Sequence, residues 1–394
     1  MKKICLIIPN LLPVPNILGG AIETIVTNVI EEQEKNNLLD LTVVTIYNKL
    51  AYQESKKYSH TKFIYIKKNL KYILCSGFYK LMNKVFHKDF NTYNHIVLGK
   101  IKKMNFDYIF AEGGHYNSFY EYLKYFKREQ LVLHLHHKGL SNDIIDKTFS
   151  KVVGVSSYVI DKFRDSSKIK EYYLLKNCIK TSDFDKPKEI DELDQIRLKY
   201  GIDKNDFLLL YCGRLIKEKG VLELIKAVKE INKKDLKLLI VGSVNFGNGG
   251  CDEYTEDLFN EAKSDKRIIF TGYIPSNMLS SYYQIATVSV IPSLWEEAAG
   301  LVCIEAMISK KPIITTGSGG ILEYVSKNTL VVGNNLDNIV SNLKDAIIKL
   351  YQKRDALLDM GEENYQVASK YSSEFYYERL VKLVGEEWEN ESKG

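Results

Sequence analysis

Apolar runs of strand length alternate with helical patterns along this chain of 394 residues. Seven such runs lie within the first 177 residues, and six more lie between residues 207 and 333. Most are continuously apolar, as in KICLIIP near the start and FLLLYC in the second half. Continuous apolar strands are typical of parallel sheets that helices cover on both faces. The pattern therefore predicts α/β architecture with two doubly wound, Rossmann-like domains.

A break in this pattern predicts the domain boundary. The stretch KTSDFDKPKEIDELDQ is polar, contains a proline and shows no periodicity. The chain is also longer than one core usually supports. We expect an N-terminal domain over residues 1–185 and a second domain over residues 186–371. A terminal helix over residues 372–394 is expected to return to the first domain.

Composition excludes several classes of protein. Apolar residues make up 45% and charged residues 27%, and no apolar run approaches the ~20 residues that span a bilayer. The apolar start breaks at Pro9, which favours a buried strand over a signal peptide and predicts a cytoplasmic protein. The six cysteines form no C-x-x-C pair, which argues against a zinc ribbon or a disulfide framework. The net charge of +5 is modest, and we expect no nucleic-acid partner.

The positive charge is unevenly placed. Residues 62–103 contain ten lysines and a single acidic residue. Within this segment, two sets of residues fall on different faces of a helical pattern: the apolar Phe78, Leu81, Met82, Val85 and Phe86, and the basic Lys80, Lys84 and Lys88. In one interpretation the apolar face packs on the first domain's sheet and the lysines are solvated. In the other interpretation, the segment contacts the anionic inner face of the cell membrane.

Ligands of open parallel sheets bind beyond the carboxyl ends of the strands, so we expect the functional residues to lie in the loops after strands. Gly19 and Gly20 precede a helical pattern, where backbone N–H groups can approach a phosphate, although an ordinary helix start looks the same. The dinucleotide fingerprint G-x-G-x-x-G is absent there, which disfavours a dehydrogenase. Arg214 and Lys219 flank a later loop, where they can converge on a diphosphate or remain solvated.

The fifth apolar run ends in a histidine cluster, LHLHHKG, which contains His134, His136 and His137. Residues 134 and 136 share one face of a strand, and residue 137 points the other way. We find no H-x-x-x-H or cysteine partner beside them and expect no metal site. A histidine at a strand end can contact a substrate or be a satisfied core residue.

The stretch WEEAAGLVCIEAM places Glu297 and Glu305 eight residues apart. Burying a carboxylate among so many apolar residues costs free energy unless the carboxylate is hydrogen-bonded. If a helix begins near Gly300, Glu305 lies in its second turn and Glu297 lies in the preceding loop. The amides of Gly300, Leu301 and Val302 then face a common anion. This arrangement suits a nucleotide sugar, whose diphosphate would bind the amides, whose ribose hydroxyls would bind Glu305 and whose sugar hydroxyls would bind Glu297. In the alternative interpretation, one glutamate caps the helix and the other lies on the helix face.

Several segments, taken in order, resemble the retaining glycosyltransferases of family 4, which have the GT-B fold. They are GRLIKEKG, FTGYI, IPSLWEEAAGLVCIEAM and KKPIITTGSGGILEYV. The resemblance covers essentially the whole chain, and LPVPNILGGAIET is similar to a subgroup of bacterial spore-coat and surface-polysaccharide enzymes. It implies two Rossmann-like domains facing a central cleft. It also implies transfer of a sugar, with retention, from a nucleoside diphosphate sugar to an acceptor hydroxyl, with a UDP-sugar favoured and a glycan, glycolipid or glycoprotein as acceptor.

The resemblance implies a role for each candidate residue. His136 and Glu297 match catalytic residues that orient the donor sugar. The donor-binding positions are Gly19, Gly20, Arg214, Lys219, Gly300, Leu301, Val302 and Glu305. No cofactor and no metal are expected, because two cations and a helix N-terminus can stabilise the leaving diphosphate. The one D-x-D match, at residues 183–185, lies in the predicted crossover between domains.

The chain departs from the family pattern at two places. Ala299 stands where an aromatic residue or cysteine is usual, and NCIK replaces the usual N-G-V-D. The first departure changes the wall around the donor sugar. Two further readings therefore stay open: an inactive sugar-nucleotide-binding or coat-assembly protein with the same fold, and a GT-B epimerase or phosphorylase.

Overall fold

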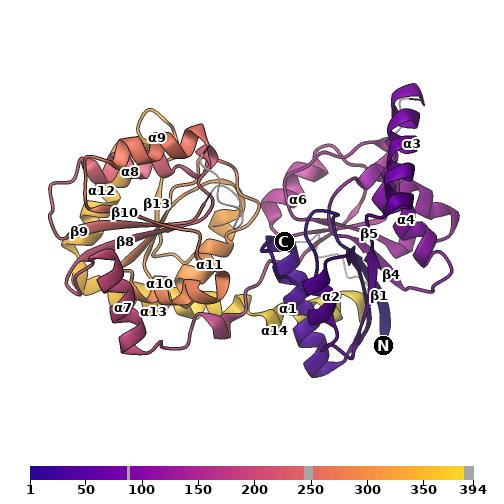
Figure 1. The fold of residues 1–394 in the computed structure, drawn as a ribbon, viewed down its shortest axis with the longest axis horizontal. Helices are drawn as coiled ribbons and strands as arrows, with labels where there is room; N and C mark the ends of the chain where they lie inside the picture. The colour runs from indigo at the N-terminus through magenta and orange to yellow at the C-terminus, as the bar shows by residue number, and fades with distance from the viewer. Residues whose placement is uncertain (87–88, 244–251, 386–394) are drawn as a thin grey trace. The chain divides into compact units, whose positions relative to one another are not determined.

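The computed structural model describes residues 1–86, 89–243 and 252–385. The chain divides into two compact units. Unit 1 comprises Met1–Asn177 together with the segment that begins at Ser373, and unit 2 comprises Cys178–Ser372 (Figure 1). Each unit is an α/β domain built on one parallel sheet.

The sheet of unit 1 has seven parallel strands in the order β3-β2-β1-β4-β5-β6-β7. They are β1 Lys2–Ile7, β2 Leu39–Ile46, β3 Thr61–Ile66, β4 Tyr108–Ala111, β5 Leu131–Leu135, β6 Lys151–Gly154 and β7 Glu171–Leu174. The central strands are buried on both faces, as their unbroken apolar runs require. Each of the seven apolar runs of the first half forms one of these strands.

Four helices of unit 1 begin where the sequence supplies a capping side chain. Asn48, Asn91, Asn142 and Ser156 each accept a backbone N–H of the turn that follows. The helices are α1 Ala21–Asn36, α2 Lys49–Ser55, α3 Leu70–Phe86, α4 Thr92–Ile101, α5 Asp143–Thr148, α6 Ser157–Arg164 and α14 Ser373–Gly385, with 3₁₀ segments η1 Tyr116–Lys124 and η2 Arg128–Gln130. None of the helices in the described ranges is long and apolar enough to cross a membrane.

The last described helix, α14, belongs to unit 1 and packs on α1. Its Tyr377 hydroxyl donates to the Gln33 side chain, and its Ser373 hydroxyl donates to Glu32 at 2.9 Å. The division between the units falls at 177/178, eight residues before the boundary expected from the polar stretch. Ile179 and Phe184 explain the difference, because both are buried in the core of unit 2.

The sheet of unit 2 has six parallel strands in the order β10-β9-β8-β11-β12-β13. They are β8 Phe207–Cys212, β9 Leu236–Val241, β10 Ile268–Gly272, β11 Val288–Ile291, β12 Ile313–Thr316 and β13 Leu330–Val332. The helices are α7 Ile190–Tyr200, α8 Val221–Lys229, α9 Glu253–Ala262, α10 Leu279–Ile285, α11 Leu301–Ile308, α12 Ile339–Gln352 and α13 Leu357–Ala368. Short 3₁₀ segments are η3 Thr181–Asp183, η4 Lys217–Lys219, η5 Ser276–Met278, η6 Gly319–Glu323, η7 Arg354–Ala356 and η8 Ser369–Tyr371.

Unit 2 has one apolar core on each face of its sheet. Strand β8 shows why: Leu209 and Tyr211 face the core shared with α8 and α12, whereas Leu208 and Leu210 face the core shared with α10 and α11. A strand buried on both sides needs apolar residues at successive positions. The predicted class, two Rossmann-like α/β domains, is confirmed.

Both sheets reverse their winding beside their first strand. The neighbours of that strand are β2 and β4 in unit 1, and β9 and β11 in unit 2. Loops that leave such neighbouring strands turn to opposite faces of the sheet and leave a crevice at the carboxyl edge. In each unit, the loops at this edge are the first place to look for a site.

Candidate functional site

Three loops meet at the carboxyl edge of unit 2, because β8, β11 and β12 are neighbours. The 3₁₀ turn η4 follows β8, and the carbonyl of Glu218 within it accepts two N–H groups from the loop after β11. These are Leu294 N–H at 2.8 Å and Trp295 N–H at 3.1 Å. The loop after β12 closes on the same segment, since Gly320 N–H donates to the Glu297 carbonyl at 2.7 Å. The backbone thus holds Glu297 in place from two sides.

Two glycines make this close approach possible. Gly220 has φ 68° and Gly319 has φ 61°, in the left-handed region that favours glycine. A Cβ on Gly220 would lie 2.0 Å from the Pro292 carbonyl oxygen, and one on Gly319 would lie 2.3 Å from the Glu297 carbonyl oxygen. Both distances are far below van der Waals contact, so any larger residue would push the loops apart.

The side chains of Lys219 and Glu297 form an ion pair, with 24% and 18% of their side-chain surfaces exposed. The Ser293 hydroxyl also donates to Glu297 Oε1, at 2.6 Å. An ammonium has three N–H donors, so Lys219 can hold Glu297 and still reach an anionic ligand. The site thereby joins a cation and a carboxylate that the sequence separates by 78 residues.

Glu305 lies in the second turn of α11, as expected, and its carboxylate accepts a hydrogen bond from the Tyr283 hydroxyl at 2.9 Å. Loss of surrounding water raises the pKa of Glu305 to about 7, although the Tyr283 bond acts in the opposite direction. The glutamate is partly exposed, and one hydroxyl does not saturate a carboxylate. Glu305 therefore retains the capacity to accept hydrogen bonds from a ligand.

The first turn of α11 supplies backbone donors at the same edge. The helix starts at Leu301 after Gly300, and no side chain caps it. The first N–H groups of an α-helix, here including those of Leu301 and Val302, have no partner within the helix. They carry the positive end of the helix dipole, which favours an anion. Arg214 lies in the loop after β8 with an exposed side chain, and its carbonyl accepts from the Tyr211 hydroxyl at 2.7 Å.

In unit 1, the predicted glycine pair ends the loop before α1. Gly19 and Gly20 have φ 89° and 103°, and Gly20 is the N-cap of the helix. The carboxyl of Glu23 folds back over this turn, with Oε2 2.1 Å from the position of a Cβ on Gly20. Burial raises the pKa of Glu23 to about 7. The helix N-terminus thus already has an acidic side chain of its own chain beside it.

Sequence reasoning missed Glu112, the first residue after β4. Its Oε2 lies 2.8 Å from His134 Nδ1 and 2.7 Å from His136 Nε2, and all three side chains are buried. Burial by itself would raise the pKa of Glu112, but the two imidazoles outweigh it and lower the pKa to about 2. Burial and the neighbouring His134 lower the pKa of His136 to about 4. At neutral pH His136 is therefore an uncharged imidazole held by an ionised carboxylate.

Glu112, His134 and His136 are also a possible set of metal ligands, because their ligand atoms lie within 4.8 Å of one another. The other ring nitrogens, His134 Nε2 and His136 Nδ1, are buried without a hydrogen-bond partner. A metal on the inner nitrogens would oblige those outer nitrogens to carry unpaired N–H groups, whereas metal-bound histidines normally donate that N–H. Two imidazoles hydrogen-bonded to an ionised Glu112 fit these surroundings better.

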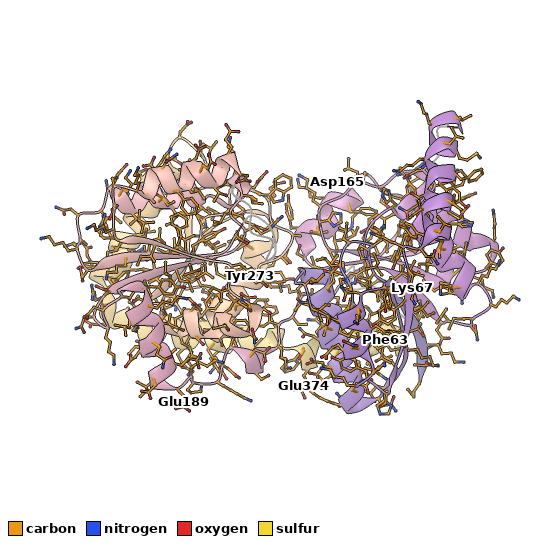
Figure 2. All side chains as sticks on the ribbon, viewed as in Figure 1. Phe63, Lys67, Asp165, Glu189, Tyr273 and Glu374 are labelled. Carbon is orange, nitrogen blue, oxygen red and sulfur yellow. The ribbon has the colours of Figure 1, made fainter. Side chains whose placement is uncertain are left out.

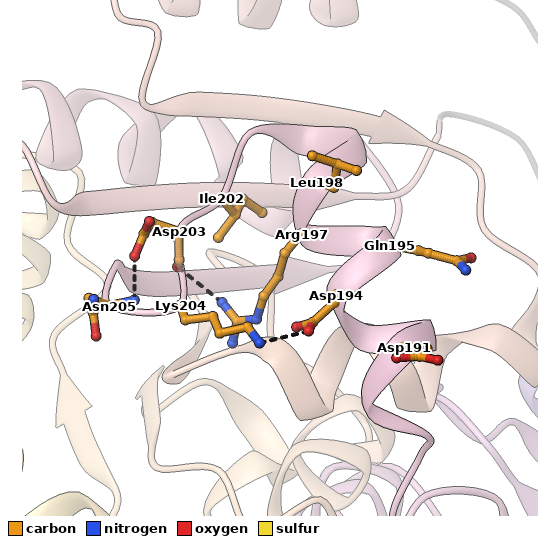
Figure 3. A pocket seen from close by; sticks show the side chains of 9 residues that line it. All are labelled: Asp191, Asp194, Gln195, Arg197, Leu198, Ile202, Asp203, Lys204 and Asn205. Carbon is orange, nitrogen blue, oxygen red and sulfur yellow. Dashed lines mark hydrogen bonds and ion pairs between the residues drawn. The ribbon is translucent and has the colours of Figure 1, made fainter.

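A shallow depression beside α7 lies at the opposite edge of the unit 2 sheet (Figure 3). Its two cationic side chains are paired within it: Lys204 with Asp194 at 2.6 Å, and Arg197 with the Asp203 carbonyl at 3.2 Å. It precedes β8, whose six residues place it roughly 20 Å from the carboxyl edge. We therefore assign it no part in the site.

Residues 193–367 match the sequence model of the family described as glycosyl transferases group 1. The uncharacterized glycosyltransferase MJ1607 of Methanocaldococcus jannaschii is 29% identical over 52% of this chain and 50% of its own length. The lipopolysaccharide 1,2-N-acetylglucosaminetransferase of Salmonella typhimurium is 29% identical over 51% of each. The chain thus matches about half the length of these relatives.

Solved structures extend the likeness to the whole chain. Anabaena Alr3699/HepE in complex with UDP and glucose has a TM-score of 0.76 at 16% identity, over 98% of this chain and 100% of that one. A glycosyltransferase from Rickettsia africae ESF-5 has a TM-score of 0.77 at 18% identity, over 97% of each. Most of unit 2 therefore resembles a group 1 glycosyl transferase domain, and the chain as a whole has the two-domain fold of these GT-B structures.

Proposed function

We propose that this protein is a retaining glycosyltransferase that uses a nucleoside diphosphate sugar as donor. One observation carries the proposal. The crevice edge of a group 1 glycosyl transferase domain brings together Lys219, Glu297, Glu305 and the uncapped start of α11. Cations and backbone donors suit a diphosphate, and carboxylates suit hydroxyl groups. A nucleotide sugar has both chemistries within one molecule.

Each group then has a distinct part. The diphosphate binds the first amides of α11, Lys219 and the exposed Arg214, which together replace a metal in stabilising the leaving group. The ribose hydroxyls donate to Glu305, and a hydroxyl of the transferred sugar donates to Glu297. His136 orients the donor sugar as a neutral imidazole, and Gly19 and Gly20 are proposed as further donor contacts.

In the chemical step, the bond between the anomeric carbon and the diphosphate oxygen breaks, and its electron pair stays on the diphosphate. The acceptor oxygen forms the new bond on the same face of the sugar, so the configuration is retained. The acceptor proton passes to the departing diphosphate oxygen. The products are the glycosylated acceptor and the nucleoside diphosphate, and no redox partner is required.

A UDP-sugar is the favoured donor, since the similarly folded Alr3699/HepE was crystallised with UDP and with UDP-glucose. We propose a glycan, glycolipid or glycoprotein acceptor from surface-polysaccharide synthesis. The relatives named for lipopolysaccharide and teichuronic acid synthesis support that class of acceptor. Ala299, which is half-buried beside Gly300, borders the space where the donor sugar would lie.

The test is release of nucleoside diphosphate from a panel of UDP-, GDP-, ADP- and dTDP-sugars, with and without lipid-linked or free saccharide acceptors. Lys219→Ala should abolish tight nucleotide binding in calorimetry, whereas Lys217→Ala, an exposed lysine of the same turn, should not. Nucleotide binding without turnover on any acceptor would favour the inactive binding protein. If the protein bound none of these nucleotides, the proposal would be contradicted.

A further inference from the structure

The outward face of α3 is an unusual surface for a folded domain. Its large apolar side chains are between 57% and 71% exposed. We call this set the α3 apolar face: Leu70, Ile73, Leu74, Phe78, Leu81 and Val85. Single exposed apolar residues are common, but a contiguous group of six marks an interaction surface. The interpretation that this face packs on the sheet of unit 1 does not agree with these exposures.

The opposite face of α3 explains how the helix is held. Tyr79 packs its ring against Phe90 at 5.4 Å and His95 at 5.1 Å, measured between ring centres. The Asn83 side chain exchanges two hydrogen bonds with the backbone of Phe90, at 2.8 and 2.9 Å. These contacts tie α3 to α4. The helix projects from the domain in Figure 1, and the exposed fractions show that its apolar face is turned away from the domain.

The charge of α3 is of one sign. Its 17 residues include three lysines and no acidic residue. Lys80 and Lys84 are exposed, and at 100° per residue they lie along one border of the apolar face. Lys88, the third lysine predicted for this border, lies outside the described residues. Lys67, labelled in Figure 2, is also exposed just before the helix, with its ammonium over the Tyr47 ring. An apolar stripe bordered by lysines is the pattern of helices that lie in a membrane interface.

We propose that the α3 apolar face inserts into the surface of an anionic phospholipid bilayer, with Lys80 and Lys84 at the level of the lipid phosphates. A bilayer offers apolar chains and negative charge side by side, which is the complement of this helix. A second copy of the chain fits less well. A two-fold interface between identical helices would bring lysines against lysines without an acidic residue on either helix.

The proposal stands apart from the proposed transfer activity, because it concerns only where unit 1 binds. If both hold, the enzyme works at a membrane and its acceptor is carried on lipid. Within the lysine-rich segment, residues 62–103, the proposal assigns the membrane contact to one face of α3. It also names the apolar residues that enter the bilayer.

The first experiment is flotation of the full chain with vesicles of phosphatidylcholine, alone or mixed with phosphatidylglycerol. We expect binding to the anionic vesicles only. Phe78→Ser with Leu81→Ser should lower the bound fraction at least tenfold, and a matched control at an exposed leucine of α2, Leu50→Ser, should leave it unchanged. No binding of the unmodified chain to anionic vesicles would overturn the proposal.

The second variant tests charge. Lys80→Glu with Lys84→Glu should also lower binding at least tenfold, and added salt should weaken the binding of the unmodified chain. Lys124→Glu with Lys170→Glu makes the same change of charge at exposed positions elsewhere in unit 1 and should bind normally. Equal loss in both pairs would overturn a specific role for α3.

A third measurement needs no variant. Hydrogen exchange of the α3 amides in the full chain should slow when anionic vesicles are added and should not change with neutral ones. Concentration-dependent dimerisation without lipid, abolished by Phe78→Ser with Leu81→Ser, would instead assign this face to a second copy and contradict the membrane proposal.

Discussion

The partly exposed carboxyl of Glu305, whose pKa is raised, makes opposite predictions for stability and for function. Glu305→Gln keeps the size of the side chain and an oxygen that can accept from Tyr283. It removes the charge that the glutamate carries above its pKa of about 7. We expect the variant to be more stable than the unmodified protein at pH 8.5 and to bind nucleotide more weakly.

The sign follows from proton binding. Between pH 4.5 and 7 the folded protein holds a proton on Glu305 that the unfolded chain has lost, so stability falls as pH rises through this window. The shift from 4.5 to about 7 corresponds to about 3 kcal/mol at about 1.36 kcal/mol per unit. This is an upper value, because side chains and water relax around the charge. For a domain of this size that upper value corresponds to a change of roughly 6–12 °C in the melting temperature.

The assay is thermal unfolding of both proteins without nucleotide from pH 5 to pH 8.5. Groups common to both proteins cancel in the difference, which should be small at pH 5, grow in favour of the variant up to about pH 7 and level off above it. Glu218→Gln, at an exposed glutamate of η4, should show no such trend. A flat difference between Glu305→Gln and the unmodified protein would refute the reasoning, since Glu305 would then titrate normally.

Nucleotide binding completes the test. A carboxylate that accepts ribose hydroxyls forms charge-assisted bonds worth about 1.5–3 kcal/mol. Calorimetry at pH 8.5 should therefore show at least a tenfold loss of UDP affinity in Glu305→Gln. A variant that is more stable and yet binds UDP equally well would show that Glu305 does not contact the ribose.

Other predictions concern the remaining parts of the site. Gly319→Ala should unfold unit 2 at lower temperature and weaken UDP binding, because its Cβ meets the Glu297 backbone; calorimetry measures both. Glu112→Gln should lower the turnover number with UDP binding unchanged, because a neutral amide oxygen holds the His136 imidazole more weakly than the carboxylate does; equal loss of UDP affinity would contradict this. Turnover should survive excess EDTA, since Lys219 and the start of α11 are proposed to stabilise the diphosphate; activity restored only by added Mn²⁺ or Mg²⁺ would contradict it.

The strands and the class of fold could be read from the sequence, because burial on both faces leaves a local record of continuous apolar residues. The start of α11 could also be read from a local pattern. Gly300 followed by apolar residues at helical spacing placed Glu305 in the second turn. The domain boundary could not be read from a local pattern in the sequence. Composition marked a polar stretch, but which core Ile179 and Phe184 join depends on the packed structure.

The partners of the site residues were decided by tertiary structure. Tyr283 lies 22 residues from Glu305, and Glu112 lies 24 residues from His136, so no spacing rule connects them. The position of Glu112 directly after a strand was the only signal in the sequence, and it gains meaning only once β4 and β5 are known to be neighbours. Parallel sheets bring such residues together through strand order, which the sequence does not state.

Helix α3 shows the same division between sequence and structure. Its periodicity determined which residues share a face, because 3.6 residues per turn is a property of the helix alone. Whether that face is covered depends on where neighbouring elements pack, and Tyr79 and Asn83 fix the other side of the helix against the domain. The sequence by itself determined that α3 is amphipathic and basic; only the tertiary structure decided that its apolar face meets solvent, because exposure is a property of what surrounds a helix.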